Sequence, residues 1–140
     1  MLQHFSVKEL VPPSVYEVRG EKSIQLFDLN ALRLLDWLRD RYGAATVNDW
    51  DWGGNFSQSG FRTVEFYGSP EKYFASFSQH KYGRAFDVKF QSVSAEEVRL
   101  DLKLNWDAQG LGFPITLEDD VSWLHVDTRP SKKIISSFKP

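Results

Sequence analysis

Candidate metal-binding side chains fall in two short segments of this 140-residue chain. Residues 78–87 contain His80 and Asp87, and residues 123–127 contain His125. The chain has three histidines, so two of them lie in these segments. Because two imidazoles and one carboxylate are a ligand set that a metal ion accepts in proteins, the segments predict a metal site if the fold brings the three side chains together.

Alternation of apolar and polar residues predicts a strand in each segment. In residues 84–90 the apolar side chains take every second position, which puts Asp87 on the opposite face of the strand. In residues 123–127 the two aliphatic side chains point one way, and Trp123, His125 and Asp127 point the other way. If the two strands pair, Asp87 and His125 share one face of a sheet.

A turn is expected to bring the third ligand to the same place. His80 precedes Asp87 by seven residues, and Gly83 between them permits a turn that folds His80 back over the strand. Three protein ligands leave a fourth position for water, which is typical of a catalytic rather than a structural zinc site. Zinc in such a site lowers the pKa of water to about 7 and polarises a substrate carbonyl.

Hydrolysis also needs a group that carries protons, and carboxylates just before the second histidine are the candidates. Glu118, Asp119 and Asp120 are close enough in the sequence, and spacing alone does not choose among them. Arg62 is a candidate for stabilising the oxyanion that develops on an attacked carbonyl. Asp127 is expected to steady His125 rather than to bind metal itself.

Composition narrows the class of protein. The net charge of −2 comes from 17 basic and 19 acidic residues without long runs of one sign, so we expect no nucleic-acid partner. The absence of cysteine leaves any metal to His, Asp and Glu. No run of about 18 apolar residues and no export signal occurs, so we expect no membrane insertion. The length suits one domain over residues 1–140.

The pattern of the remaining elements predicts an α+β fold with a small antiparallel sheet flanked by helices. Helices are predicted after Ser6, ending before the two prolines that follow, over residues 28–42, and after Ser94. Residues 47–52 and 60–67 are predicted as strands. The tail, residues 130–140, is expected to be partly irregular.

These segments together resemble the zinc D,D-/L,D-peptidases of the M15 type, which share their fold with the Hedgehog signalling domain and include bacteriophage endolysins. The pattern Ser-x-His-x-x-Gly-x-Ala-x-Asp is matched by residues 78–87 at all five fixed positions. Residues 59–62, Ser-Gly-Phe-Arg, are similar to the family's Ser-Gly-Tyr-Arg segment, and residues 123–127 resemble its Trp-Val-His-Val ending. The resemblance spans roughly residues 4–129.

By this resemblance His80, Asp87 and His125 are zinc ligands, and Arg62 assists substrate binding or carbonyl polarisation. The acid/base is less direct, because the position three residues before the second histidine, where some members have glutamate, is Ser122 here. Relatives of the Trp-x-His type place their glutamate a few residues before the tryptophan. That spacing indicates Glu118, with Asp120 as the alternative.

The resemblance implies a substrate in the peptide stem of bacterial peptidoglycan, with Ser78, Tyr82 and Trp52 as further substrate-binding residues. Trp52 and Tyr82 lie in an aromatic-rich part of the chain and are equally compatible with a structural role. We expect a monomer that is made in the cytoplasm and reaches the wall after release, as a phage lysis enzyme would. The alternatives are a zinc-binding module without activity and a phage structural or tail component that keeps the hydrolase fold.

Overall fold

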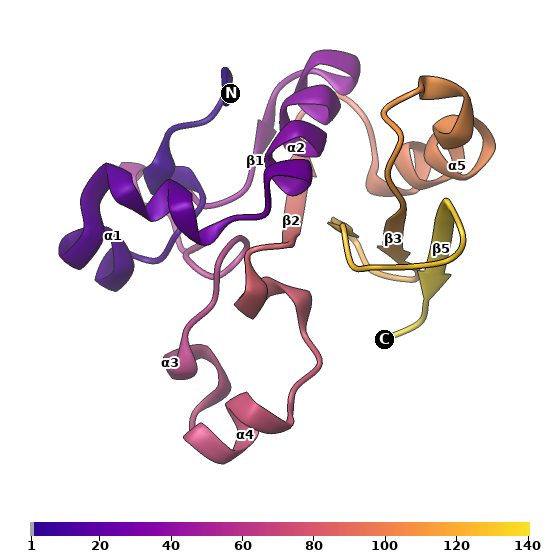
Figure 1. The fold of residues 1–140 in the computed structure, drawn as a ribbon. Helices are drawn as coiled ribbons and strands as arrows, with labels where there is room; N and C mark the ends of the chain where they lie inside the picture. Colours follow the sequence, from indigo (N-terminus) through magenta and orange to yellow (C-terminus); the bar gives the residue numbers. More distant parts are fainter. Residues whose placement is uncertain (1) are drawn as a thin grey trace.

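A mixed five-stranded sheet with helices around it forms the α+β fold of this protein (Figure 1). The computed structural model describes residues 2–140. The strands are β1 (Ala45–Thr46), β2 (Ala85–Phe90), β3 (Ile115–Glu118), β4 (Leu124–Asp127) and β5 (Ile135–Phe138). The α-helices are α1 (Pro13–Arg19), α2 (Leu29–Tyr42), α3 (Val64–Tyr67), α4 (Pro70–Ala75) and α5 (Ala95–Asn105). The 3₁₀ helices are η1 (Val7–Glu9), η2 (Gly20–Leu26), η3 (Trp50–Trp52), η4 (Gln79–Tyr82) and η5 (Trp106–Gln109).

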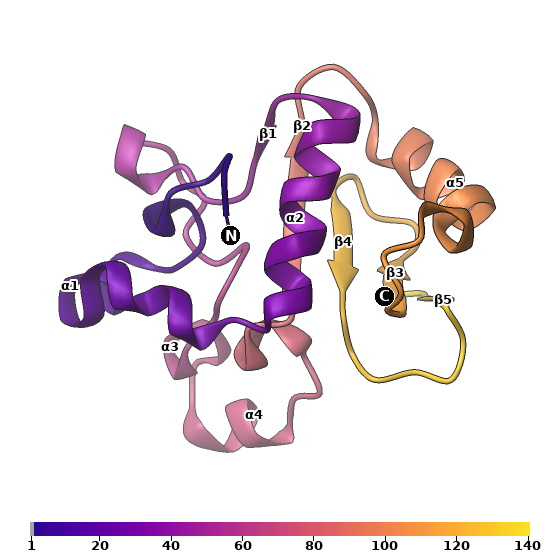
Figure 2. The same ribbon diagram turned by 45° about the horizontal axis from the view of Figure 1, so that its top comes forward.

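The strands lie side by side in the order β1-β2-β4-β3-β5. All neighbours are antiparallel except β3 and β5, which are parallel. The expectation of a purely antiparallel sheet is therefore wrong at one edge. After β4 the chain makes a wide loop and enters β5 in the direction of β3 (Figure 2). Within the tail, residues 130–140, β5 is regular and the residues on either side of it form no helix or strand.

One face of the sheet packs on the helices and forms the core. Helix α2 lies along β2, and α5 packs against β4 (Figures 1 and 2). The side chains that alternate toward this layer are fully or almost fully buried, so the predicted division of each strand into an apolar and a polar face is confirmed. They are Phe86, Val88, Ile115, Leu117, Leu124 and Val126 from the sheet, with Leu34, Leu35, Leu38, Val98 and Leu102 from the helices.

Two helix predictions are confirmed closely. Helix α2 begins directly after Asp28 and ends at Tyr42, before Gly43. Helix α5 follows Ser94, whose Oγ accepts a hydrogen bond from the N–H of Glu97 at 3.1 Å. These two helices form the layer on which the strands rest.

The N-terminal prediction is confirmed only in part. The N–H of Ser6 donates to a carboxylate oxygen of Glu9 at 2.7 Å, as a capping box requires, and the short helix η1 follows. The prolines, however, begin a helix rather than end one, because Pro13 occupies the first position of α1.

The strands predicted at 47–52 and 60–67 are wrong. The first of these segments contains η3, and the second ends in α3. Backbone groups here are satisfied by other loops: Phe61 N–H donates to the carbonyl of Leu10 at 2.9 Å, and Arg62 N–H donates to the carbonyl of His80 at 3.3 Å. A sheet partner is therefore not needed. From α3 and α4, which project away from the sheet in Figure 1, the chain returns through η4 to β2.

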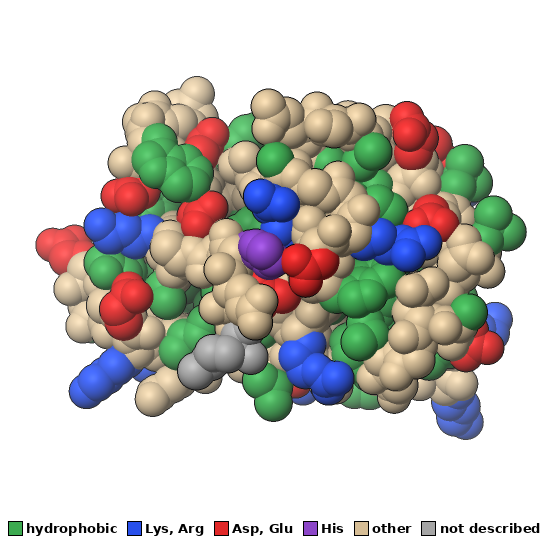
Figure 3. Space-filling view, turned by 90° about the horizontal axis from the view of Figure 1, so that it is seen from above, with side chains coloured by type: hydrophobic (Ala, Val, Ile, Leu, Met, Phe, Trp, Pro, Cys, Tyr) green, Lys and Arg blue, Asp and Glu red, His purple; other side chains and the backbone are tan. Residues whose placement is uncertain are grey.

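The surface seen from above in Figure 3 carries acidic and basic side chains interspersed among polar and apolar ones. Such mixing agrees with the small net charge of the chain. Among residues 2–140, no helix has both the length and the apolar composition that crossing a bilayer requires.

Gly83 is required where η4 turns into β2, and this generates a stability prediction. Its φ is +68°, and a Cβ there would lie 1.9 Å from the carbonyl oxygen of Leu26. Gly110 has a similar φ of +73°, but a Cβ there would meet nothing within 4 Å. We expect Gly110→Ala to lower the free energy of unfolding by about 1–2 kcal/mol, the cost of the left-handed conformation. Gly83→Ala should lower it by roughly 3 kcal/mol or more, since a steric clash adds to that cost.

Urea unfolding of the two variants beside the native chain measures both losses. Equal losses at the two positions would contradict the argument that close approach to Leu26 constrains this turn.

Candidate metal centre

Four neighbouring strands place one residue each in a row across the polar face of the sheet. Asp87 of β2 is paired directly with His125 of β4. The β3–β4 register pairs Leu117 with Val126, so Glu118 follows opposite His125. Glu118 is paired in turn with Phe138 of β5. Because directly opposed residues lie on the same face, with Cβ atoms about 5 Å apart, the row brings a carboxylate, an imidazole and a second carboxylate together.

His80 reaches this row from η4, which precedes β2. The turn is anchored to the rest of the protein, because the carbonyl of Gly83 accepts a hydrogen bond from the N–H of Asp28 at 2.9 Å. His80 is only 2% exposed, and its ring lies beside that of His125, with centroids 5.1 Å apart. The predicted fold-back of His80 over the strand is what the structure has.

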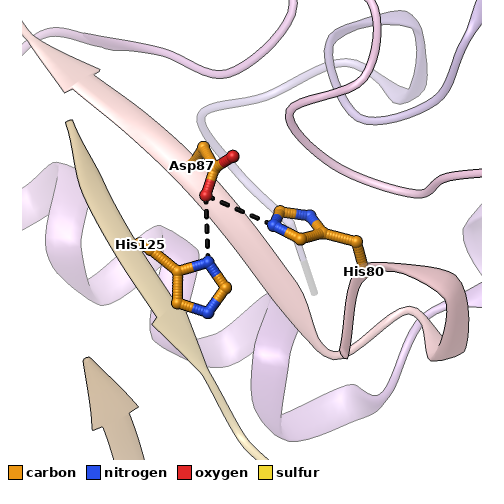
Figure 4. A group of neighbouring side chains, drawn as sticks. All are labelled: His80, Asp87 and His125. Atoms are coloured by element: carbon orange, nitrogen blue, oxygen red, sulfur yellow. Dashed lines mark hydrogen bonds and ion pairs between the residues drawn. The ribbon is translucent and has the colours of Figure 1, made fainter. Parts of the chain in front are cut away.

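A single oxygen of Asp87 is the meeting point of the three side chains (Figure 4). Oδ1 lies 3.2 Å from Nε2 of His80 and 3.0 Å from Nδ1 of His125. One ligand atom from each of the three buried residues lies within 4.8 Å of the other two. The group could therefore hold a metal ion.

The other nitrogen of each imidazole also faces an acceptor. Nδ1 of His80 lies 2.9 Å from the carbonyl oxygen of Gly60, and Nε2 of His125 lies 2.9 Å from Oδ2 of Asp127. A neutral imidazole carries one N–H, so it can satisfy only one of its two acceptors. A cation held between the imidazoles and Asp87 resolves this shortage, because each ring then donates its N–H outward and presents a lone pair inward. The donor set thus fits a metal ion.

Without a metal the two imidazoles differ in charge preference. Burial disfavours the charged form of both rings. For His125, hydrogen bonds to Asp127 and Asp87 outweigh burial and raise its pKa to about 9. For His80 burial prevails over the attraction of Asp87, and its pKa is lowered. Burial also opposes ionisation of Asp87, but hydrogen bonds from His125 and His80 hold its pKa well below the ordinary value.

Two guanidinium groups lie beyond the carboxylates of this site. Arg62 donates from Nη2 to Oδ2 of Asp87 at 3.0 Å, and its Nε donates to the carbonyl of Gln58 at 2.7 Å. Arg129 binds the fully buried Asp127 with Nε at 2.8 Å from Oδ1 and Nη2 at 2.5 Å from Oδ2. Each buried carboxylate therefore has an arginine as well as a histidine partner.

An open cleft of about 550 Å³ contains the site. Six of the residues expected to act at the site line it: Arg62, Ser78, His80, Asp87, Glu118 and His125. Three others do not. Trp52 in η3 is 64% exposed and Tyr82 is 53% exposed, each outside the cleft lining. Asp120 has a largely exposed side chain that lies 4.0 Å from Nζ of Lys139.

Sequence reasoning missed several residues of the cleft wall. These are Phe77, Gln79, Trp123, Arg129 and Phe138. Alternation does put Trp123 on the face of His125, two positions away, but it assigns Trp123 no role at the site. Arg129 and Phe138 lie in or near the segment expected to be partly irregular, where no pattern assigned them a place.

Comparisons of this chain with protein-family models, with curated proteins and with solved structures found no match.

The raised pKa of His125 predicts how stability depends on pH in the metal-free protein. A folded-state pKa of about 9 against an ordinary value of 6.5 contributes stability that is fully present below pH 6.5. That contribution is lost as pH rises toward 9. We expect the free energy of unfolding, measured by urea titration in the presence of a chelator, to fall over this range. Asp127→Asn should flatten the fall, because it removes one of the two carboxylates that raise the pKa.

Asp119→Asn is the matched control, since Asp119 pairs with Lys103 at 2.7 Å away from both histidines. It should leave the slope between pH 6.5 and 9 as in the native chain. The account is wrong if native and Asp127→Asn proteins show the same slope.

Proposed function

We propose that this protein is a zinc-dependent peptidase that hydrolyses peptide bonds in the peptide stem of bacterial peptidoglycan, and that it acts as a phage lysis enzyme. The observation that carries the proposal is the position of Glu118, which shares one cleft with His80, Asp87 and His125. Two imidazoles, a carboxylate ligand and a further carboxylate beside them are the parts that metal-assisted hydrolysis needs. The sequence resemblance to M15-type peptidases supplies the substrate class.

Zinc suits the ligand set of this site. Two histidine nitrogens and a carboxylate oxygen, without cysteine, leave a coordination position open, as catalytic zinc sites do. Ligand atoms at zinc bonds of about 2.0–2.1 Å lie roughly 3.3 Å apart in a tetrahedron. The separations of 3.2 and 3.0 Å between Asp87 Oδ1 and the two imidazole nitrogens are near that value. When bound, zinc lowers the pKa of a water and polarises the substrate carbonyl.

Glu118 is the residue we assign to proton transfer. It lies one strand from His125 at the end of β3, and among residues 2–140 its carboxylate forms no ion pair, whereas Asp119 and Asp120 each pair with a lysine. In the reaction Glu118 takes a proton from the attacking water and returns it to the nitrogen of the leaving amine. The register of β3 on β4 holds it beside the site while keeping it out of the ligand group.

Arg62 is the residue we assign to the oxyanion. Its guanidinium is fixed by Asp87 on one side and by the ring of Phe66, 4.0 Å away, on another. A fixed cation at the cleft wall can accept the negative charge that develops on the carbonyl oxygen without reorganising. Ser78 also lines the cleft, and we assign it to contacts with the peptide.

The test measures zinc content and the release of amino groups from purified peptidoglycan on the same preparations. We expect one zinc per chain and cleavage by the native protein. Glu118→Gln should keep its zinc and lose cleavage by about 10²–10⁴-fold, the usual contribution of a positioned acid/base. His80→Ala should lose zinc as well, because it removes a ligand.

Asp120→Asn is the control for Glu118→Gln, since it removes a nearby carboxylate outside the cleft, and it should cleave as the native protein does. Bound zinc without cleavage of any wall type would reject the peptidase and leave a zinc-binding module or a structural component. Failure to take up zinc would reject both the peptidase and the zinc-binding module.

A further inference from the structure

An unbroken chain of charged contacts crosses the floor of the cleft. Arg62 contacts Asp87 at 3.0 Å, Asp87 contacts His125 at 3.0 Å, and His125 contacts Asp127 at 2.9 Å. Arg129 completes it at 2.5 Å from Asp127. The candidate metal ligands lie near the middle, and a guanidinium stands at each end. The two arginines therefore stand at opposite ends of this chain of contacts, and both line the cleft.

Arg129 is held rigidly with part of its guanidinium toward the cleft. Nε and Nη2 form a fork on the two oxygens of Asp127, and the ring of Phe138 lies 5.0 Å from the guanidinium carbon. Asp127 is fully buried, whereas the side chain of Arg129 is 33% exposed and lines the cleft. Among residues 2–140, no group accepts a hydrogen bond from Nη1 of Arg129. A fixed, partly exposed guanidinium with a free N–H edge is suited to bind a carboxylate.

The charge of the cleft favours an acidic ligand. Asp87 and Glu118 line the cleft and Asp127 lies buried beneath Arg129, while Arg62 and Arg129 are its permanent cations. With a divalent ion bound and neutral imidazoles as ligands, positive charge exceeds negative charge. A substrate that brings a carboxylate restores the balance inside a site where charges are weakly screened.

We propose that Arg129 binds a carboxylate of the substrate, so that the cleft selects stem peptides with a free carboxyl group next to the scissile bond. The inference rests on the proposed peptidase function. Contacts of 2.9 and 2.5 Å separate Nε2 of His125 from the guanidinium of Arg129. Because Nδ1 of His125 faces the other ligands and Nε2 faces Asp127, Arg129 lies on the outer side of this ring, and we assign the carboxylate that it binds to a residue near the cleaved bond. Arg62, the more buried arginine, lies at the other end of the chain of contacts and is the one we assign to the carbonyl oxygen.

The experiment uses synthetic stem peptides that are identical except that one carboxyl group is a carboxamide. The measured quantity is the ratio of kcat/KM for the free-acid form to that for the carboxamide form. We expect the native protein to prefer the free acid by roughly tenfold to a hundredfold at one carboxyl position, the size of a charged hydrogen bond. Arg129→Gln should bring this ratio close to one, and Arg129→Lys should give an intermediate ratio.

The ratio of kcat/KM for the free acid to that for the carboxamide distinguishes binding of a substrate carboxylate by Arg129 from mere support of Asp127 by Arg129. If Arg129 only holds Asp127, Arg129→Gln slows both forms equally and keeps the ratio, which overturns the proposal. Lys133→Gln removes the same charge from a surface outside the cleft and should keep the native ratio. A native ratio near one at every carboxyl position also overturns the proposal.

A binding measurement keeps the inference testable if the peptidase proposal fails. Should the zinc-loaded native protein cleave no peptide, the same pairs are titrated calorimetrically into native and Arg129→Gln protein. Tighter binding of a free acid that is lost in the variant supports the carboxylate site without the activity. Equal affinity for acid and carboxamide, or no binding of either, overturns it.

Discussion

The buried oxygen Oδ1 of Asp87 is the constraint on which the site depends. Two imidazoles face it, and each imidazole has a further acceptor on its other nitrogen, the carbonyl of Gly60 for His80 and the carboxylate of Asp127 for His125. These four contacts each need an N–H donor, and two neutral rings supply only two. Burial makes an unsatisfied contact costly, so the arrangement is stable only with extra positive charge at its centre. A metal ion supplies it in one step, and protonation of His125 supplies it in part.

The register of β2 on β4 keeps this meeting point together. Asp87 opposes His125 because Phe86 and Val126, on the other face, are fully buried against the helices. A slip by one residue would turn the polar side chains into the core and the apolar ones into the cleft. The hydrophobic layer therefore stabilises the sheet and, through the period of two, also decides which side chains can reach a ligand.

Alternation of apolar and polar residues predicts the strands that carry Asp87 and His125. The failed predictions share a cause, because each concerns residues whose structure depends on segments distant in the sequence. Alternation places Asp87 and His125 on one face, but residues 135–138 show no alternation that predicts a strand, and their parallel pairing with β3 depends on a contact with a segment distant in the sequence. Residues 60–63 have a strand-like composition, yet their backbone is satisfied by Leu10 and η4, contacts between segments distant in the sequence. Arg129 lies beyond the end of β4, and its fork on Asp127 emerges only from the fold.

The proposed chemistry therefore depends on strands that the motif segments do not contain. The ligands come from η4, β2 and β4, whereas Glu118 is held at the end of β3 between β4 and β5. Phe138, its neighbour on β5, packs against the ring of His125 at 5.6 Å between centroids and against Arg129. The last strand thus contacts a ligand, the proposed base and the proposed carboxylate-binding arginine at once. A chain with all three ligands but without β5 would lack Phe138, and with it the contacts to His125 and Arg129 on which the proposed catalysis depends.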